Sequence, residues 1–206
     1  MSITTSDITL EKALPGSLRA GVARREITIC REGVAVHDPL FVKSLVLDDG
    51  KTPLVIIAMD AVAIGGIADV RDDFLSRLRL RIEEDLGIPG AHVLVNASHT
   101  HPANNILCDD ADLLERVFDT VRQAQAERVA VRVGAGRGEE DRIIINRTLR
   151  LKDGRAWTIR HSNPCPPDED VEALGPIDPE IGLLKIDRLD GSTLAVVYNY
   201  ACHTLI

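Results

Sequence analysis

Two short apolar runs with a helical segment between them limit the folds that this sequence can adopt. The first run spans Leu54 to Met59 and the second spans Val93 to Ala97, and both have the length and composition of buried strands. Between them, over 67–86, apolar residues recur four apart, as on one face of a helix, and Gly87 ends the pattern. A strand, a helix and a strand in this order predict a right-handed crossover between parallel neighbours.

Six further strand-like segments and a second helical segment complete the predicted architecture. A hairpin is expected where Phe41 to Leu47 alternates and ends on Asp48-Asp49-Gly50, and the apolar run that follows has the character of a buried central strand. Other strands are expected over 21–29, 129–133, 143–145, 183–186 and 194–200, and a helix over 111–127. The sequence therefore predicts an α/β fold: a single domain over 1–206 with a mixed β-sheet, flanking helices and one β-α-β crossover unit.

Two segments lack a regular pattern. The glycines over 134–138 are not followed by the Lys-Ser/Thr of a phosphate-binding P-loop, so they predict a turn. Prolines recur between Pro164 and Pro179 and exclude a helix through most of this stretch. We expect a long ordered loop or flap there.

Composition excludes several classes of function. The 206-residue chain has a net charge of −8 and a pI of about 5.2, and its Lys and Arg residues form no cluster, which argues against nucleic acid as a partner. No run reaches the roughly 18 to 20 apolar residues of a membrane-spanning helix, and the first residues lack the pattern of a secretory signal. The four cysteines form no CxxC pair, as expected for reduced thiols. We therefore expect a cytoplasmic protein without a transmembrane segment.

Polar residues end both strands of the crossover unit. Asp60 follows the first apolar run, and His99 and His101 follow the second. Because parallel neighbours end at the same edge of a sheet, these side chains are expected to meet where ligands bind in open α/β sheets. In an extended chain, residues two apart point to the same side, so the two imidazoles are presented together. The spacing predicts a metal site here, with Asp60 either capping the following turn or supporting a metal-bound histidine.

Among the remaining histidines, one is a candidate and three are not singled out. His203 follows a strand-like run within the string NYACH, and Cys202 beside it points to the opposite face, as a packing residue would. His37, His92 and His161 stand singly, as surface or hydrogen-bonded histidines do. His203 is therefore the further residue to test as a metal ligand.

Six strings of the sequence, taken together, resemble the neutral/alkaline (non-lysosomal) ceramidase family. They are DPLFVKSLVLDDG, the apolar strand that ends in Asp60, NASHTH, INRT, PIDPEIGLLKID and NYACH, and they occur in the family's order between Gly21 and His203. The resemblance is to the N-terminal part of the family's catalytic domain. It implies a zinc-dependent hydrolase of an N-acyl amide bond, which is that of ceramide in the named enzymes. Aromatic residues that could line a lipid groove make up only 3% of the chain, and no signal sequence is visible, so a small cytosolic N-acyl compound is as open as a lipid-like substrate.

The resemblance also implies roles for individual residues. His99, the first histidine of the HTH string, and His203 of NYACH match zinc ligands of the family. His101 matches a histidine beside the substrate, and Arg147 matches the arginine of the INR string. Zinc accepts neutral imidazole nitrogens and polarises a carbonyl or lowers the pKa of bound water, while an arginine or a second histidine stabilises oxyanion charge.

The sequence departs from the family pattern at several points. The family's HTHSGP is HTHPAN here, and its Gly-x-Gly is Gly21-Val22-Ala23, which keeps Gly21 for substrate binding but prevents a close backbone approach at Ala23. The aspartate of the family's DIT string is Glu26. The family's Glu and Tyr zinc ligands and its catalytic Ser lie beyond Ile206. We therefore expect the 206-residue chain alone to bind zinc weakly and to be inactive.

Two alternatives remain open at the level of the sequence. An HxH metalloenzyme of the amidohydrolase barrel type would use both His99 and His101 as ligands, but it predicts eight βα units where this sequence shows one clear β-α-β unit. A non-catalytic binding domain of the same fold is favoured by the altered loop after His101. The two alternatives differ in whether metal is bound and by which histidines.

Overall fold

The computed structural model describes residues 18–30, 32–67, 70–101, 106–159 and 164–202 of the chain. In chain order, the helices and strands of the described residues are β1 (Arg19–Glu26), β2 (Phe41–Asp48), β3 (Pro53–Met59), α1 (Phe74–Leu86), the 3₁₀ helix η1 (Gly90–His92), β4 (Val93–Ala97), α2 (Asp110–Ala126), β5 (Val129–Glu139), β6 (Thr148–Leu151), β7 (Ala156–Thr158), the 3₁₀ helix η3 (Asp168–Asp170), β8 (Val171–Leu174), β9 (Glu180–Arg188) and β10 (Thr193–Tyr200).

The described strands form a seven-stranded sheet in the order β10-β9-β5-β1-β2-β3-β4 and a three-stranded sheet in the order β7-β6-β8. β1 pairs antiparallel with β2 and β2 with β3, whereas β3 and β4 are parallel. The larger sheet is therefore mixed. The described residues also form two α-helices, α1 and α2. The predicted α/β fold with one β-α-β crossover is confirmed.

Two compact units can be distinguished within the chain. Among the described residues, the larger unit comprises those within 18–134 and 185–196, and the smaller unit comprises those within 135–184 and 197–202. Strands β5, β9 and β10 each supply residues to both units. The single domain expected from the sequence stays a prediction.

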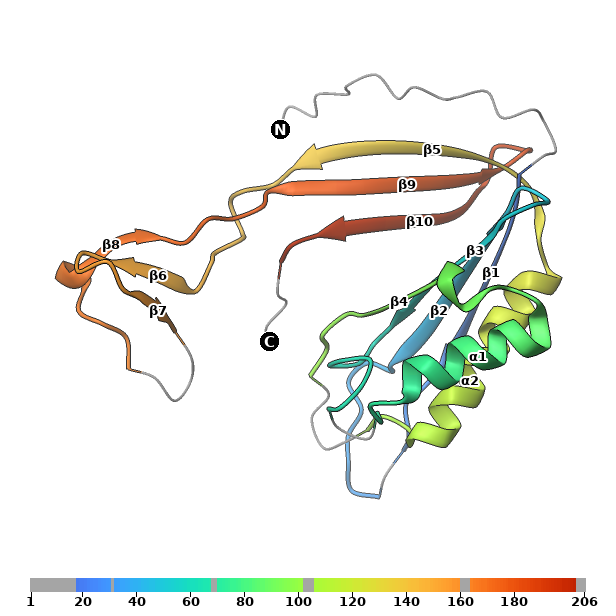
Figure 1. Ribbon diagram of the computed structural model, residues 1–206, viewed down its shortest axis with the longest axis horizontal. Coiled ribbons are helices and arrows are strands. Elements are labelled where there is room, and N and C mark those ends of the chain that lie inside the picture. The colour runs from blue at the N-terminus through green and yellow to red at the C-terminus, as the bar shows by residue number, and fades with distance from the viewer. Residues whose placement is uncertain (1–17, 31, 68–69, 102–105, 160–163, 203–206) are drawn as a thin grey trace. The chain divides into compact units, whose positions relative to one another are not determined.

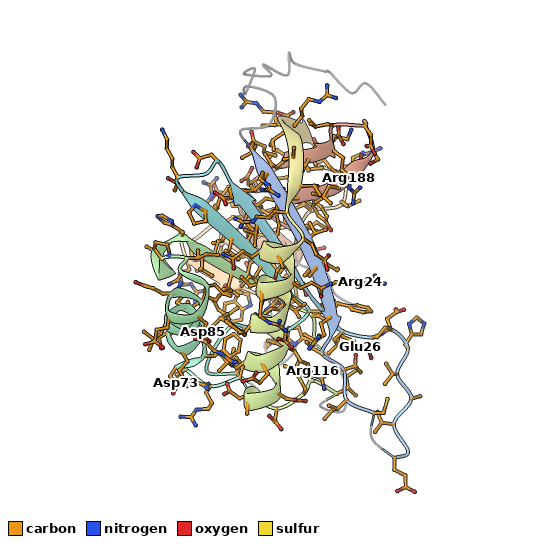
Figure 2. The ribbon with its side chains drawn as sticks, turned by 90° about the vertical axis from the view of Figure 1, so that its right-hand side faces the viewer. Arg24, Glu26, Asp73, Asp85, Arg116 and Arg188 are labelled. Atoms are coloured by element: carbon orange, nitrogen blue, oxygen red, sulfur yellow. The ribbon has the colours of Figure 1, made fainter. Side chains whose placement is uncertain are left out.

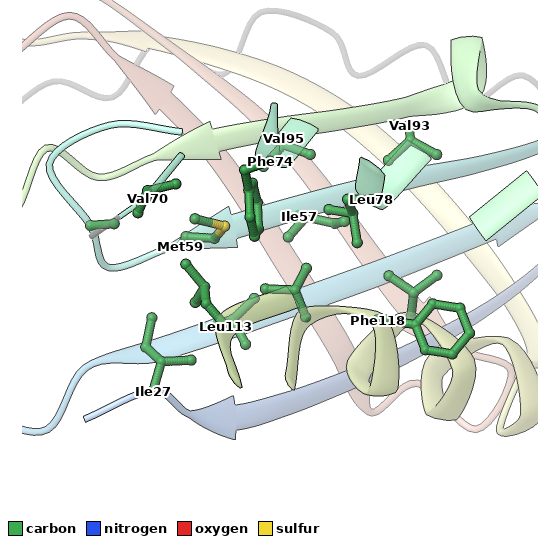
Figure 3. Close-up of a cluster of buried hydrophobic side chains, with 14 of the residues drawn as sticks. Ile27, Ile57, Met59, Val70, Phe74, Leu78, Val93, Val95, Leu113 and Phe118 are labelled. Carbon is green, nitrogen blue, oxygen red and sulfur yellow. The ribbon is translucent and has the colours of Figure 1, made fainter. Parts of the chain in front are cut away.

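In the larger unit, α1 and α2 cover the same face of β1–β4 (Figure 1). Each helix presents an apolar stripe to that face: Phe74, Leu78 and Ile82 of α1 recur four apart and are fully buried. They pack with Ile57 and Met59 of β3 (Figure 3). Because these two residues are two apart in the strand, their side chains lie on the same face of the sheet, the one that the helices cover. This core fixes β3 and β4 side by side and so determines where the two strands end.

Polar contacts attach α2 to its neighbours. Arg116 donates a hydrogen bond of 2.8 Å to the carbonyl of Glu26 at the end of β1 (Figure 2). Asp110, the first residue of α2, is 9% exposed, accepts the amide of Arg71 at 2.9 Å and pairs with the guanidinium of Arg77 of α1. Because a buried carboxylate needs such donors, these contacts hold the start of α1 against the start of α2.

The predicted boundaries of the first helix are wrong at its start. The helical pattern over 67–86 predicts a helix from Ile67, but α1 begins at Phe74. Gly66 has a φ of 69°, in the left-handed region, and Ile67 and Val70 form an isolated bridge. The amide of Val70 donates to the carbonyl of Ile67 at 3.4 Å instead of forming a helical hydrogen bond, so α1 begins only after these residues.

Three predictions in the second half of the chain are also corrected. The glycines over 134–138 lie inside β5 and form no turn, since neither Gly136 nor Gly138 has a positive φ and an alternating strand continues through them. No strand forms over 143–145, where Ile144 is buried but its neighbours are more than two-thirds exposed. Within the expected loop or flap, β8 pairs with β6, which is already paired with β7, so part of this stretch is sheet.

The central strand β3 is less enclosed than its composition predicts. Its residues alternate in burial, and Leu54, on the face away from the helices, is 40% exposed.

The described part of the chain contains no helix long and apolar enough to cross a bilayer. The strands predicted over 183–186 and 194–200 are confirmed by β9 and β10, and the helix predicted over 111–127 is confirmed by α2.

Candidate active site

The parallel strands β3 and β4 end side by side, and the backbone continues their pairing for one step. The amide of Ser98, just after β4, donates to the carbonyl of Met59 at 2.9 Å. Asp60, just after β3, donates its amide to the Phe41 carbonyl at 2.9 Å and accepts the Phe41 amide on its carboxylate at 3.0 Å. The carboxyl ends of the two strands therefore lie together, as the sequence predicts, with Asp60 on one and the histidines on the other.

His99 has an unusual backbone conformation. Its φ is 61°, and it is the only residue other than glycine with a positive φ among the described residues. The sequence predicts an extended path from His99 to His101, but the strand ends at Ala97 and the chain turns at His99. A left-handed residue with a side chain is costly and is found where the surrounding structure requires it, often at functional sites.

The ring of His99 has one nitrogen committed to the backbone. Its Nδ1 lies 2.7 Å from the carbonyl oxygen of Val62, in the connection that follows β3. Because a carbonyl can only accept, Nδ1 must carry the proton, and in the neutral ring Nε2 is then the acceptor nitrogen. This is the tautomer in which a histidine offers Nε2 to a metal while its other nitrogen is held by a backbone carbonyl.

His101 faces the other nitrogen of His99. The two Nε2 atoms are 3.2 Å apart, and the rings meet edge to face with centroids 4.6 Å apart and planes at 86°. Because the proton of the neutral His99 ring is on Nδ1, its Nε2 accepts, and His101 donates to it from its own Nε2. On the far side of this turn, the hydroxyls of Ser98 and Thr100 are hydrogen-bonded at 2.7 Å. The two imidazoles therefore converge on one point, as the sequence predicts.

Two other predicted site residues, Gly21 and Arg147, belong to the described chain. Gly21 is buried in β1 beneath α2, where a Cβ would meet the backbone carbonyl oxygen of Ala124 at 1.9 Å, so its lack of a side chain serves helix packing. Arg147 is exposed in the smaller unit, just before β6, and its carbonyl accepts the amide of Ile159. Its role in catalysis stays a prediction. His203 lies outside the described residues.

The other histidines and the cysteines offer no second centre in the described chain. His37 is exposed and hydrogen-bonded to Asp38 at 2.8 Å. His92 is half-buried at the opposite end of β4, and its buried Nδ1 has no partner among the described residues. Burial raises the pKa of the Cys108 thiol to about 11, so it stays protonated and is a poor nucleophile. His161 is outside the described residues.

Within the described residues, no three His, Cys, Asp or Glu side chains are grouped closely enough to hold a metal ion. A hollow of about 520 Å³ is lined by the far end of the connection between β3 and α1, at Gly66, Val70 and 71–73, and not by the histidines. The chemistry that the described chain supplies at the strand ends is therefore two imidazoles, one of them in the tautomer that suits a metal.

Sequence reasoning missed one functional group of this site, the Val62 carbonyl. It is a main-chain oxygen, so no residue type signals its role. The only hint in the sequence is indirect: the glycines Gly65 and Gly66 mark a tight connection after β3, and a tight connection returns the backbone toward the strand ends.

Comparisons with known proteins support the fold and leave the activity open. No family model matches the sequence, and no curated protein matches it. The similar solved structures include one described as ceramidase complexed with C2, with a TM-score of 0.63, and the neutral ceramidase from Pseudomonas aeruginosa, with a TM-score of 0.59. Each is 18% identical to this chain and matches 93% of it, but the match covers 32% of the ceramidase chain. The chain therefore spans about a third of these proteins, and what it shares with them is a ceramidase-like fold.

Proposed function

We propose that this chain carries part of the active site of a zinc-dependent hydrolase that cleaves an N-acyl amide bond. The observation that carries the proposal is the contact between His99 Nδ1 and the Val62 carbonyl, which puts the proton on Nδ1 and makes Nε2 the nitrogen of the ring that can ligate a metal. The ceramidase-like fold supports the same class of reaction. The proposed substrate is a small-molecule or lipid-like N-acyl compound, and the proposed location is the cytoplasm.

The imidazole nitrogens of the described site are donors of a type that zinc binds. Zinc in proteins is held by three or four ligands, and neutral imidazole nitrogens are among its preferred donors. His99 offers one such nitrogen, and we propose His203 as the second protein ligand. When bound, zinc would polarise the substrate carbonyl and lower the pKa of the water bound to it.

His101 is proposed to act beside the zinc ligand and not as one. Its Nε2 lies 3.2 Å from His99 Nε2, so a donor on His101 would lie beside a carbonyl polarised by zinc on His99. A donor placed there stabilises the oxyanion of a tetrahedral intermediate, an effect that is typically worth about 3 kcal/mol for one donor.

A second candidate function has its own observation. The 3.2 Å between the two Nε2 atoms is close to the roughly 3.3 Å that separates two nitrogen ligands in a tetrahedral zinc site with Zn–N bonds of about 2.0 Å. The same geometry therefore suits a metallohydrolase in which both His99 and His101 are ligands.

Metal content of histidine variants of the intact protein separates these functions. We expect His99→Ala and His203→Ala to lose both zinc and N-acyl hydrolysis, while His101→Ala keeps zinc and loses roughly a hundredfold or more in kcat. His37→Ala is the matched control, because His37 is exposed and distant in sequence from the strand ends. Zinc is measured by plasma mass spectrometry, and hydrolysis with ceramide and with short N-acyl amides.

Each other outcome decides against the proposal. Loss of zinc from His101→Ala would favour the site with two histidine ligands. Retention of zinc by His99→Ala would remove His99 from the ligand set. An intact protein that binds no zinc and hydrolyses none of the amides would be a non-catalytic binding domain.

A further inference from the structure

Asp60 fixes the point where the backbone leaves the sheet. Its amide and its carboxylate both bond to Phe41, so the ladder between β2 and β3 closes with a two-point clamp at 2.9 and 3.0 Å. The next residue, Ala61, is fully buried and donates its amide to the Met59 carbonyl at 3.0 Å. The direction of the chain after β3 is therefore set by hydrogen bonds between backbone groups and by one further bond, from the Phe41 amide to the Asp60 carboxylate.

Val62 follows directly from this clamp. It lies two residues after Asp60, and its carbonyl oxygen is the acceptor for His99 Nδ1 at 2.7 Å. Further along the connection, Ile64 packs on the core and the amide of Arg71 is held by the buried Asp110. The carbonyl is thus carried by a segment that is anchored on both sides, with Asp60 as the nearer anchor.

We propose that Asp60 is a positioning residue, which fixes the ring orientation and the Nδ1–H tautomer of His99 through the Val62 carbonyl. The carboxylate accepts the Phe41 amide and so holds the acceptor in place. A histidine whose acceptor can shift is free to exchange tautomers, because the proton position is set by the hydrogen bond of the other nitrogen. What this tautomer serves rests on the proposed zinc function, but the link from Asp60 to His99 does not.

The tautomer can be measured directly on the metal-free 206-residue chain. Two-bond ¹H–¹⁵N correlation spectra of the imidazoles, at a pH where the rings are neutral, distinguish Nδ1–H from Nε2–H. We expect His99 to be Nδ1–H in the unmodified chain, and Asp60→Ala to convert it to a mixture or to the Nε2–H form. Asp60→Asn should keep Nδ1–H, because the amide oxygen can still accept the Phe41 amide.

Asp49 provides a matched control at the opposite end of the same strand pair. Its carboxylate accepts the amides of Lys51 and Thr52 at 2.9 and 2.7 Å in the turn between β2 and β3. Asp49→Ala therefore removes backbone hydrogen bonds of the same kind and should leave His99 unchanged. Asp60→Glu is the second variant if Asp60→Ala does not fold, since it keeps the charge but moves the carboxylate by one methylene. It should also disturb the tautomer.

The proposal is overturned if His99 is Nε2–H in the unmodified chain, or if a folded Asp60→Ala or Asp60→Glu keeps the Nδ1–H form. Zinc affinity of the intact protein separates this inference from the proposed function. Asp60→Ala should weaken zinc binding by about tenfold to a hundredfold, as removal of a supporting group does. An intact protein with His99 as Nδ1–H but without zinc binding would sink the proposed function and leave the positioning role of Asp60 standing.

Discussion

At the residue scale, the backbone of His99 brings the two imidazoles together at a cost in stability. An L-residue in the left-handed region is less stable than in the right-handed one by about 1 to 2 kcal/mol, and glycine avoids that cost. With a φ of 61°, His99 therefore occupies a position that glycine would favour. The chain therefore carries a ring at a position where backbone stability alone would favour glycine.

This leads to a prediction about a pair of variants that both lack the ring. We expect His99→Gly to be more stable than His99→Ala by about 1 kcal/mol, because only glycine relieves the left-handed backbone. Urea unfolding at neutral pH measures the difference. The same pair at Ser98, whose φ is not positive, should show the usual order with glycine the less stable. Equal stabilities at His99 would mean that the chain there is not held in the left-handed region.

At the element scale, the approach of α2 to β1 depends on a missing side chain. A Cβ at Gly21 would lie 1.9 Å from the Ala124 carbonyl oxygen, and the obstacle is helix backbone, which cannot rotate away. We expect Gly21→Ala to lower the free energy of unfolding by about 3 kcal/mol, at the upper end of overpacking effects. Urea unfolding monitored by circular dichroism is the measurement.

Gly136 in β5 provides the comparison for this prediction. A Cβ there meets nothing within 4 Å, and the backbone is extended. Gly136→Ala should therefore be neutral or stabilising by about 0.5 kcal/mol, through the lower entropy of the unfolded chain. If Gly21→Ala were as well tolerated, the helix would not pack on β1 as closely as described.

The elements with strong periodicity could be predicted from the sequence, and those decided by local backbone geometry could not. The β-α-β unit and α2 follow from apolar spacing, which reports directly on burial. The start of α1 could not be predicted, because the apolar spacing continues through Ile67 and Val70 although Gly66 turns the chain before the helix begins. The glycines of β5 misled for the opposite reason: their composition is that of a turn, while their neighbours in the sheet hold them extended.

The candidate site divides in the same way. That His99 and His101 lie with Asp60 at one sheet edge could be predicted, because strand direction determines which ends meet. The tautomer of His99 could not, since it depends on the Val62 carbonyl and therefore on the path of a loop. The left-handed turn at His99 has no sequence signal of its own, because histidine carries no such preference comparable to that of glycine.

At the scale of the whole molecule, carboxylates held by basic side chains and backbone amides determine the response to acid. Arg142 lowers the pKa of Glu140 to about 2, through hydrogen bonds from its guanidinium and its amide. Arg122 and Arg25 lower the pKa of Asp119, and the amides of Thr52 and Lys51 lower that of Asp49. Each of these groups has a lower pKa in the folded chain than in the unfolded chain.

The sign of the pH dependence follows from these shifts. A carboxylate with a lowered folded pKa contributes stability above its unfolded value of about 4.5 or 3.8, and that contribution is lost as the pH falls toward the folded value. We expect the urea midpoint to be nearly constant from pH 7 to about pH 5 and to fall steadily below about pH 4.5. Arg142→Ala should raise the midpoint of the Glu140 titration toward 4.5, measured by carboxyl ¹³C shifts. A Glu140 midpoint unchanged in that variant would contradict the assigned cause.

The crossover between β3 and β4 has a consequence for how the molecule acquires its chemistry. β1, β2 and β3 form an antiparallel meander, whereas β4 joins the sheet in parallel only after the chain from Asp60 to His92 has closed around α1. Long-range parallel pairing is slower to form than local hairpins, because loop closure must precede the contacts that reward it. β4 also lies at the edge of the sheet, paired on one side, and edge elements open at lower cost than central ones. The two histidines therefore come together only once this crossover has formed, and they separate when the edge strand opens, before the rest of the sheet unfolds.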